Sequence, residues 1–209
     1  MSRTLVVGDV HGCADELAAL LDRASPDRVV SVGDLFTRGP DPVGVWDLVR
    51  GSDAVLGNHD EKVLAPEPGG HAAAVADALD RADPRWRAWV AGLPLFLEVG
   101  RFTVVHAGLH PSGSLDHTTR RMALTMRRWP DEAPDRPFWW QVYAGDRAVL
   151  FGHDAARGHH MVDWGEDRWL VALDSGCVYG GALTGFCVEE ERVYAVPARR
   201  AYAPMRPIG

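Results

Sequence analysis

The sequence predicts an α/β fold in which helices cover a parallel sheet. Short apolar runs alternate with amphipathic segments from the start of the chain. Several of these runs end in Gly-Asp, Gly-Asn or histidine, which is typical of buried strands that lead into loops. Apolar residues make up 46% and charged residues 24% of the chain. This composition is that of a soluble globular protein, and we expect one domain over residues 1–209.

The first half of the chain predicts strands and helices in alternation. Leu17, Leu20 and Leu21 stand at helical spacing before Pro26, which predicts a helix that ends near this proline. The expected elements of this half are a strand at residues 5–7, a helix at 14–24, a strand at 28–32, a helix at 42–50, a strand at 54–56 and a helix at 71–92.

The second half predicts mainly strands. Two strands are joined around Gly100-Arg101, and a hairpin turns at residues 189–191. The expected elements of this half are strands at residues 95–99 and 102–105, helices at 117–128 and 137–143, and strands at 148–151, 169–173, 183–188 and 193–196.

Charge and cysteine content restrict the classes of function. The net charge of −7 argues against a general nucleic-acid binder, so a phosphate-bearing ligand would need local cations, which bound metal ions could supply. Cys13, Cys177 and Cys187 are too few for a disulfide framework and fit a reducing compartment. Without a leader peptide or an apolar run of membrane-spanning length, we expect a cytoplasmic protein with no membrane partner.

Five of the expected strands end in polar side chains. In open α/β sheets, ligands bind beyond the carboxyl ends of the strands, so such residues can meet. Asp, His and Asn supply oxygen and nitrogen ligands, which suit Mn²⁺, Fe or Zn²⁺ rather than Ca²⁺. Each residue alone would be explained as a turn or helix cap, but five in register predict a metal site. The residues are Asp9 and His11, Asp34, Asn58 and His59, His106, and His153.

The same residues lie in motifs that resemble the phosphoprotein-phosphatase branch of the calcineurin-type metallophosphoesterases. These motifs are GDVHG (8–12), GDLFTRGP (33–40), GNHD (57–60), HAG (106–108) and GH (152–153). Within that branch, segments 8–21, 106–111 and 173–184 are most similar to the bacterial symmetrical dinucleoside tetraphosphatases. The resemblance implies a β-sandwich of two mixed sheets flanked by helices, in four layers ordered αββα.

The resemblance also implies a binuclear metal centre. Asp9, His11 and Asp34 would hold one divalent ion. The second ion would be held by Asn58, His106, His153 and the same Asp34, which would bridge the two. Mn²⁺ is the expected metal, with Fe, Zn²⁺, Co²⁺ or Ni²⁺ as alternatives. A hydroxide shared by the two ions would attack phosphorus in line.

Roles for the remaining site residues follow from the same resemblance. Arg38 and Asn58 would bind phosphate oxygens, and His59 would protonate the leaving oxygen as a general acid. Protein phosphatases usually carry an aspartate at the position of Thr37, which the dinucleotide branch commonly lacks. What orients His59 is therefore open, although Asp60 is adjacent in sequence.

Several further residues could contact the substrate. Tyr179 is equally well explained as a residue beside the active site and as a core tyrosine. Trp139, Trp140 and Tyr143 could stack on a nucleobase, but a place in the core is favoured. Four arginines between His106 and His153 are expected on a solvated helix face, with polyphosphate contact as the alternative. They are Arg120, Arg121, Arg127 and Arg128.

Three functions remain open from the sequence. The first is symmetrical hydrolysis of diadenosine tetraphosphate and related dinucleoside polyphosphates, a phosphorylated small-molecule substrate. The second is dephosphorylation of phosphoproteins on serine, threonine or tyrosine. The third is an inactive metal- or nucleotide-binding module, against which the ligand set and His59 argue. The sequence predicts no oligomeric state.

Overall fold

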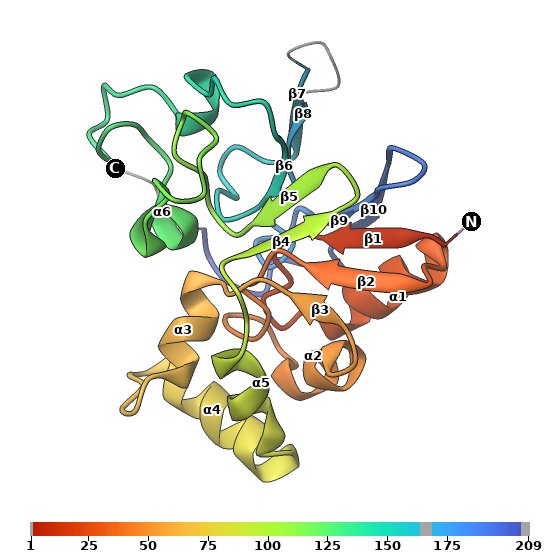
Figure 1. Ribbon diagram of the computed structural model, residues 1–209. Coiled ribbons are helices and arrows are strands. Elements are labelled where there is room, and N and C mark those ends of the chain that lie inside the picture. The colour runs from red at the N-terminus through yellow and green to blue at the C-terminus, as the bar shows by residue number, and fades with distance from the viewer. Residues whose placement is uncertain (1, 164–168, 206–209) are drawn as a thin grey trace.

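The computed structural model describes residues 2–163 and 169–205 and contains two mixed five-stranded sheets (Figure 1). The first sheet consists of β1 (Thr4–Val7), β2 (Arg28–Ser31), β3 (Asp53–Ala54), β9 (Ala182–Cys187) and β10 (Arg192–Pro197). The second consists of β4 (Phe96–Val99), β5 (Phe102–Val105), β6 (Ala148–Phe151), β7 (His160–Asp163) and β8 (Trp169–Ala172). The predicted sandwich of two mixed sheets is confirmed.

The strand orders are β10-β9-β1-β2-β3 and β4-β5-β6-β8-β7. Neighbours β1, β2 and β3 run parallel, as do β5, β6 and β8, whereas β9, β10, β4 and β7 pair antiparallel with their neighbours. The three strands that were expected from alternation with helices, β1, β2 and β3, are therefore the parallel part of the first sheet. Their carboxyl ends point the same way, which is the arrangement that a shared site requires.

Alternation along the strands builds the core. Leu5 and Val7 of β1 face the helical layer, while Val6 between them faces the second sheet. In β6, Leu150 packs between the sheets and Val149 points to the outer layer. Burying one such aliphatic side chain contributes about 1.5–3 kcal/mol, so the layer between the sheets is a main source of stability.

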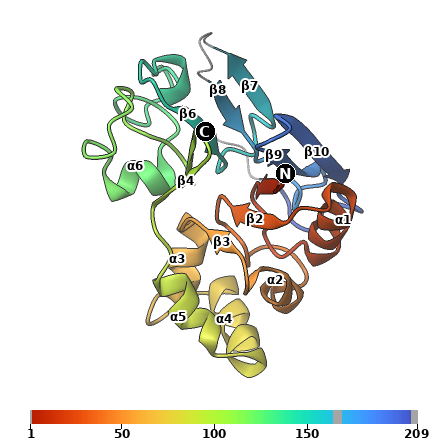
Figure 2. The same cartoon turned by 45° about the vertical axis from the view of Figure 1, so that its right-hand side comes forward.

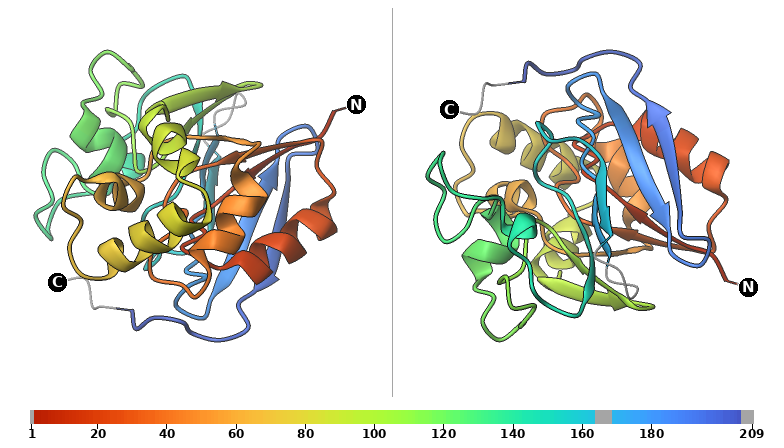
Figure 3. Two further views of the ribbon diagram at one scale, coloured as in Figure 1. Left: turned by 90° about the horizontal axis from the view of Figure 1, so that it is seen from below. Right: turned by 90° about the horizontal axis from the view of Figure 1, so that it is seen from above.

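Helices cover the outer face of the first sheet and its β3 edge. They are α1 (Ala14–Ala24), α2 (Pro42–Val49), α3 (Asn58–Leu64), α4 (His71–Ala82) and α5 (Arg85–Ala91). Helix α1 packs on β9 and β10, and α3, α4 and α5 contact one another (Figures 2 and 3). The layer outside the second sheet is made of loops, the short helix α6 (Arg120–Thr125) and the 3₁₀ turn η1 (Trp139–Gln141).

Several expected helices are wrong in extent. The single helix expected at residues 71–92 is two helices, because the residue before Pro84 is held extended, with φ −163° at Asp83. The helix expected at 117–128 is limited to α6, which begins after Thr119, whose side chain accepts a hydrogen bond from the Met122 amide. The helix expected at 137–143 is only η1.

Two elements were not expected. Helix α3 follows β3 after three residues and carries the polar sequence NHDE at its start, so it lacked an apolar periodicity. Strand β7 pairs with β8 and is an edge strand of the described sheet. Among the helices of residues 2–163 and 169–205, none is long and apolar enough to cross a membrane.

Candidate active site

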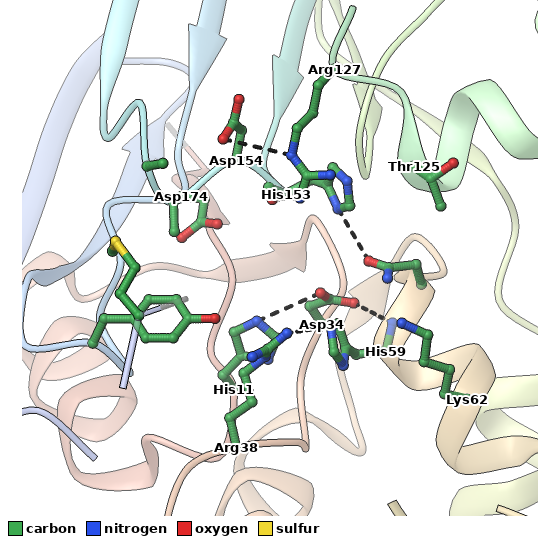
Figure 4. A pocket seen from close by; sticks show the side chains of 15 residues that line it. His11, Asp34, Arg38, His59, Lys62, Thr125, Arg127, His153, Asp154 and Asp174 are labelled. Carbon is green, nitrogen blue, oxygen red and sulfur yellow. Dashed lines mark hydrogen bonds and ion pairs between the residues drawn. The ribbon is translucent and has the colours of Figure 1, made fainter. Parts of the chain in front are cut away.

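Polar side chains that follow six strands of both sheets gather at one pocket (Figure 4). His11, Asp34, Asn58, His153 and Asp174 line it, whereas Asp9 and His106 are buried next to these lining residues. Each side chain follows the carboxyl end of its strand, and each sheet contributes three parallel strands. Asp9 and His11 follow β1, Asp34 follows β2, Asn58 follows β3, His106 follows β5, His153 follows β6, and Asp174 follows β8. The pocket has a volume of about 330 Å³.

The metal-ligand candidates form two groups that share Asp34. The ligating atoms of Asp9, His11 and Asp34 all lie within 4.8 Å of one another, as do those of Asp34, His106 and His153. Asp34 Oδ2 lies 3.6 Å from His11 Nε2, and Asp34 Oδ1 lies 3.6 Å from His106 Nε2. One carboxylate therefore faces each group with a different oxygen.

Asn58 joins the second group through its side-chain oxygen. Asn58 Oδ1 lies 3.0 Å from His106 Nε2 and 3.1 Å from His153 Nδ1. His106 Nδ1 lies 2.8 Å from the Val32 carbonyl oxygen, which can only accept, so this nitrogen carries the proton and Nε2 presents a lone pair. His153 Nε2 is buried and has no hydrogen-bond partner among residues 2–163 and 169–205. Lone pairs thus converge here without enough donors, which fits a divalent cation.

The pKa shifts of these residues also favour bound divalent cations. Burial raises the pKa of Asp34 to about 7. Burial and the charges of Asp174 and Asp34 raise the pKa of Asp9 well above its usual range. Burial also lowers the pKa of His106 to about 4. Divalent ions would stabilise the ionised carboxylates while the imidazoles stay neutral, so this donor set suits them.

Backbone strain is concentrated at the site. His11, Asp34, Arg38 and His153 adopt positive φ values of 48°, 55°, 71° and 73°. Such conformations cost a non-glycine residue of order 1–3 kcal/mol each and persist only where the surroundings enforce them. Gly57 permits the close approach of Asp34, because a Cβ there would collide with the amide and carboxylate of Asp34.

Asp60 fixes the loop that carries Asp34. Its carboxylate accepts hydrogen bonds from the amides of Asp34 (2.7 Å), Leu35 (2.9 Å) and Gly57 (3.3 Å). Asp60 is fully buried and therefore turns away from the pocket. It holds the start of α3 against the Asp34 loop and does not orient His59.

Thr37 and Arg38 contact different histidines of the pocket. Thr37 Oγ1 lies 3.2 Å from His11 Nδ1, which leaves His11 Nε2 directed at Asp34. Arg38 Nη2 lies 2.8 Å from His59 Nε2, and because arginine only donates, that nitrogen is the acceptor. His71, which has no place in the pocket, accepts a hydrogen bond from the Arg38 amide.

Among the described residues, three cationic side chains line the pocket: Arg38, Lys62 and Arg127. Arg127 Nη2 donates to the His153 carbonyl oxygen at 3.2 Å, and its Nε lies 3.7 Å from Asp154 Oδ1. In Figure 4, Arg127 and Arg38 approach the metal-ligand candidates from opposite sides. Sequence reasoning missed Lys62, because its place depends on the unexpected helix α3.

The other arginines of the 120–128 stretch do not line this pocket. Arg120 pairs with Glu61, with Nη2 and Oε1 2.7 Å apart. Arg128 lies over the Phe138 ring at 4.4 Å. Arg121 lines a separate shallow depression beside α6. Only one of the four arginines is therefore placed to meet a ligand at the metal-ligand candidates.

The aromatic candidates divide between pocket and core. Tyr179 lines the pocket, and the Arg38 guanidinium carbon lies 5.7 Å from its ring centroid. Trp139 and Tyr143 are buried in the core outside the second sheet. Trp140 stacks on Phe138, with ring centroids 5.5 Å apart, and is not part of the pocket lining.

Asp174 also lines the pocket and was missed from the sequence. It directly follows the apolar segment 169–173, as Asp34 follows 28–32, so the same signal could have found it. Burial raises its pKa to about 7. The site therefore holds one more buried carboxylate than was expected.

A family model of calcineurin-like phosphoesterases matches residues 2–184. The chain belongs to this family. It is accordingly a metal-dependent phosphoester hydrolase. The family implies divalent metal ions, and the two ligand groups around Asp34 fit that requirement.

Similar proteins carry two different activity names. A protein of Geobacillus thermodenitrificans named asymmetrical bis(5'-nucleosyl)-tetraphosphatase PrpE is 28% identical, covering 95% of this chain and 96% of its own. A protein of Aromatoleum aromaticum named symmetrical bis(5'-nucleosyl)-tetraphosphatase is 30% identical, covering 92% and 96%. A solved structure described as a candidate diadenosine tetraphosphatase is 31% identical, with a TM-score of 0.76 over 94% of each chain.

Proposed function

We propose that this phosphoesterase hydrolyses dinucleoside polyphosphates at a binuclear metal centre and cleaves diadenosine tetraphosphate symmetrically into two molecules of ADP. The observation that carries the proposal is the pair of arginines, Arg38 and Arg127, on opposite sides of the metal-ligand candidates. The similar proteins named above support a dinucleotide substrate.

The proposed ligands follow the two groups around Asp34. Asp9, His11 and Asp34 would hold one ion, and the other would be held by Asp34, Asn58, His106 and His153. We propose Mn²⁺, with Fe, Zn²⁺, Co²⁺ or Ni²⁺ as alternatives that the same donors accept. When bound, two such ions supply positive charge at the phosphoryl group and lower the pKa of water.

Arg38, Asn58 and Tyr179 are the proposed substrate contacts. The Arg38 guanidinium contacts His59 Nε2 at 2.8 Å. If Arg38 donated to a phosphate oxygen of the substrate instead, His59 Nε2 would lose this contact and become free. Burial and the Arg38 charge lower the pKa of His59 to about 3. A substrate anion would offset the charge of Arg38, which raises that pKa and allows His59 to carry the proton for the leaving oxygen.

The opposed arginines favour cleavage in the middle of a phosphate chain. In symmetrical cleavage, further phosphates extend on both sides of the broken bond, so cations on both sides have partners. In asymmetrical cleavage, one side of the broken bond carries only a nucleoside monophosphate. A phosphoprotein offers a single phosphoryl group, which leaves Arg127 without a phosphate. The chain has a net charge of −7, so these local cations are what attract the substrate.

The deciding experiment compares substrates side by side at saturating Mn²⁺. We expect diadenosine tetraphosphate to show a higher kcat/KM than a phosphoserine peptide and to yield two ADP. ATP plus AMP would contradict the symmetrical cleavage. A preferred phosphopeptide would favour the protein-phosphatase alternative, and no turnover of any phosphoester would favour an inactive binding module.

A variant of Arg127 tests the structural basis of that preference. Arg127→Gln should lower kcat/KM for diadenosine tetraphosphate about tenfold or more, since a charge-assisted hydrogen bond contributes about 1.5–3 kcal/mol. The variant should change p-nitrophenyl phosphate hydrolysis little, because that substrate has one phosphoryl group. Arg128→Gln is the matched control and should leave both rates unchanged. An equal loss on both substrates in Arg127→Gln would contradict the role.

A further inference from the structure

A second cluster of metal-ligating side chains lies outside the lining of the active-site pocket. The sulfur atoms of Cys13 and Cys177 and a carboxylate oxygen of Glu16 all lie within 4.8 Å of one another. All three residues are buried, with exposed fractions of 0%, 1% and 2% for Cys13, Cys177 and Glu16. We propose that this cluster binds one thiophilic divalent cation of the zinc class, separate from the phosphoesterase metals.

Glu16 supplies an oriented and incompletely satisfied carboxylate. Its Oε1 accepts hydrogen bonds from the Arg199 amide at 2.9 Å and the Tyr202 hydroxyl at 2.7 Å. Its Oε2 is buried and has no hydrogen-bond partner in the part of the chain that the structure describes. A buried carboxylate oxygen without a partner is unfavourable, and a cation would satisfy it. The contacts to Oε1 are of the kind that hold a ligating carboxylate in place.

Cys13 stands at the N-terminal cap of α1 and makes no side-chain capping bond. Cys177 comes from the loop after β8, so the two sulfurs are brought together by the fold and not by a short spacing in sequence. The contact with Cys13 and the burial of Cys177 raise the pKa of the Cys177 thiol, which therefore keeps its proton in the metal-free protein.

The charge balance of binding can be written out. Each thiol loses its proton, so two protons are released when the cation binds. Two thiolates and one carboxylate then carry three negative charges against the two positive charges of the ion. The Arg199 amide and the Tyr202 hydroxyl, which donate to Glu16 and lower its pKa, stabilise the remaining negative charge. Three protein ligands leave one position of a tetrahedral site free.

Donor chemistry separates this cluster from the active site. The ligand candidates around Asp34 offer only oxygen and nitrogen, which suit Mn²⁺, whereas thiolates prefer Zn²⁺ and its chemical relatives. The cluster joins three segments: the turn after His11, the loop that carries Asp174 and Tyr179, and the C-terminal segment held through Tyr202. A bound cation would therefore cross-link the segments that frame one side of the pocket.

Cobalt spectroscopy can test the proposal independently of phosphoesterase activity. Co²⁺ bound by sulfur shows a thiolate-to-cobalt charge-transfer band in the near ultraviolet, which oxygen and nitrogen ligands cannot produce. We expect the reduced full-length protein, titrated with Co²⁺, to develop this band. Cys177→Ser should lose it. Cys187→Ser is the matched control and should keep it, because Cys187 is equally buried but contacts Glu189 instead of the cluster.

Glu16→Gln provides a variant that keeps the fold even if the cysteine variants do not. The amide oxygen can still accept from Arg199 and Tyr202, but the ligating charge is lost. We expect chelator competition to show at least tenfold weaker Co²⁺ binding at the sulfur band, with an unchanged circular dichroism spectrum. Absence of the band in the wild-type protein, its persistence in Cys177→Ser, or its loss in Cys187→Ser would overturn the proposal.

Discussion

Thr37 shows how a single residue changes the interpretation of the site. At this position, where an aspartate would orient His59, the threonine hydroxyl instead contacts His11 Nδ1 at 3.2 Å. His59 is held by Arg38, with 2.8 Å between Nη2 and Nε2. The Thr37 hydroxyl thus contacts His11, a metal-ligand candidate, and Arg38 makes the contact with His59, the candidate general acid.

Thr37→Val should therefore weaken metal binding. Valine has the shape of threonine but cannot accept the proton of His11 Nδ1, so the ring loses the contact that directs Nε2 to Asp34. Loss of such an orienting contact typically costs about 10–100-fold in metal affinity. Isothermal titration of metal-free protein with Mn²⁺ measures it. Thr37→Ser keeps the hydroxyl and should bind as the wild type does, and equal affinities of all three proteins would contradict the role.

Asp34→Asn should remove more metal than any other single ligand substitution. The two oxygens of Asp34 face different ligand groups, and the amide of asparagine can donate only one oxygen. Asparagine also tolerates the φ of 55° at this position, so the backbone should persist. Elemental analysis of purified variants, with Asp9→Asn as the comparison, decides the point. Two ions retained in Asp34→Asn would remove the bridging role.

His59→Ala should keep its metal and lose turnover. General acid catalysis is worth roughly 10²–10⁴-fold in rate, so kcat should fall within that range for substrates with poor leaving groups. The loss should be smaller for p-nitrophenyl phosphate, whose leaving oxygen needs less protonation. An equal loss for both kinds of substrate would argue that His59 acts by position or charge and not as an acid.

Among the secondary-structure elements, α3 has the most influence on the site. It carries Asn58, His59 and Lys62 on one short helix, and the buried carboxylate of Asp60 ties its first turn to the Asp34 loop. Three amides that would otherwise be unpaired in the interior donate to this one side chain. A helix of seven residues has little stability of its own, so this tie and the contacts with α4 and α5 hold it.

Asp60→Asn should destabilise the protein by about 1–3 kcal/mol, since the amide group would face backbone N–H donors that need an acceptor. Chemical unfolding of the metal-free protein measures the change. Glu61→Gln, at the neighbouring exposed residue that pairs with Arg120, is the control and should shift stability by less than about 1 kcal/mol. Similar effects of the two substitutions would show that the Asp60 contacts are not structural.

The elements also show where sequence reasoning reached its limit. Strand ends were predictable because apolar runs stop at Gly-Asp, Gly-Asn or histidine, and parallel strands bring such ends together. Helix α3 was missed because its seven residues begin in a polar motif. The helix expected over 117–128 shrank to α6, since tertiary contacts of the loop before it override local propensity. The place of Arg127 depends on that loop, so the sequence alone could not distinguish it from its arginine neighbours.

At the scale of the whole molecule, the candidate active site is formed by residues from both sheets. Asp9 and Asp34 come from the first sheet, while His106 and His153 come from the second. Between them lie buried carboxylates, and burial raises the pKa of Asp34, Asp60 and Asp174 to about 7 in each case. Stability and metal content should therefore be coupled through pH.

The metal-free protein should lose stability as pH rises from about 7 to about 8. Folding raises the pKa of these carboxyls from 3.8 to about 7, so the folded state holds more protons and its advantage is lost as they leave. The buried histidines act in the opposite sense, because folding lowers their pKa from 6.5, but this effect fades within about one pH unit above that value.

Thermal melts of chelator-treated protein across this pH range check the prediction. Protein loaded with Mn²⁺ is the control: it should melt at a higher temperature and show a flatter dependence on pH, because the ions replace the protons. A melting temperature of the metal-free protein that rises over the same range would contradict the argument.

Lys62 has a practical consequence for studying this enzyme. It is the chain's single lysine, it is solvent-exposed, and it lines the mouth of the pocket on the same helix as His59. An amine-directed fluorophore or cross-linker that targets ε-amines would consequently mark one location, beside the reaction centre. Shielding of that amine by added nucleotides would rank ligands by occupancy without any turnover, and a dye attached there would serve as an optical sensor of binding.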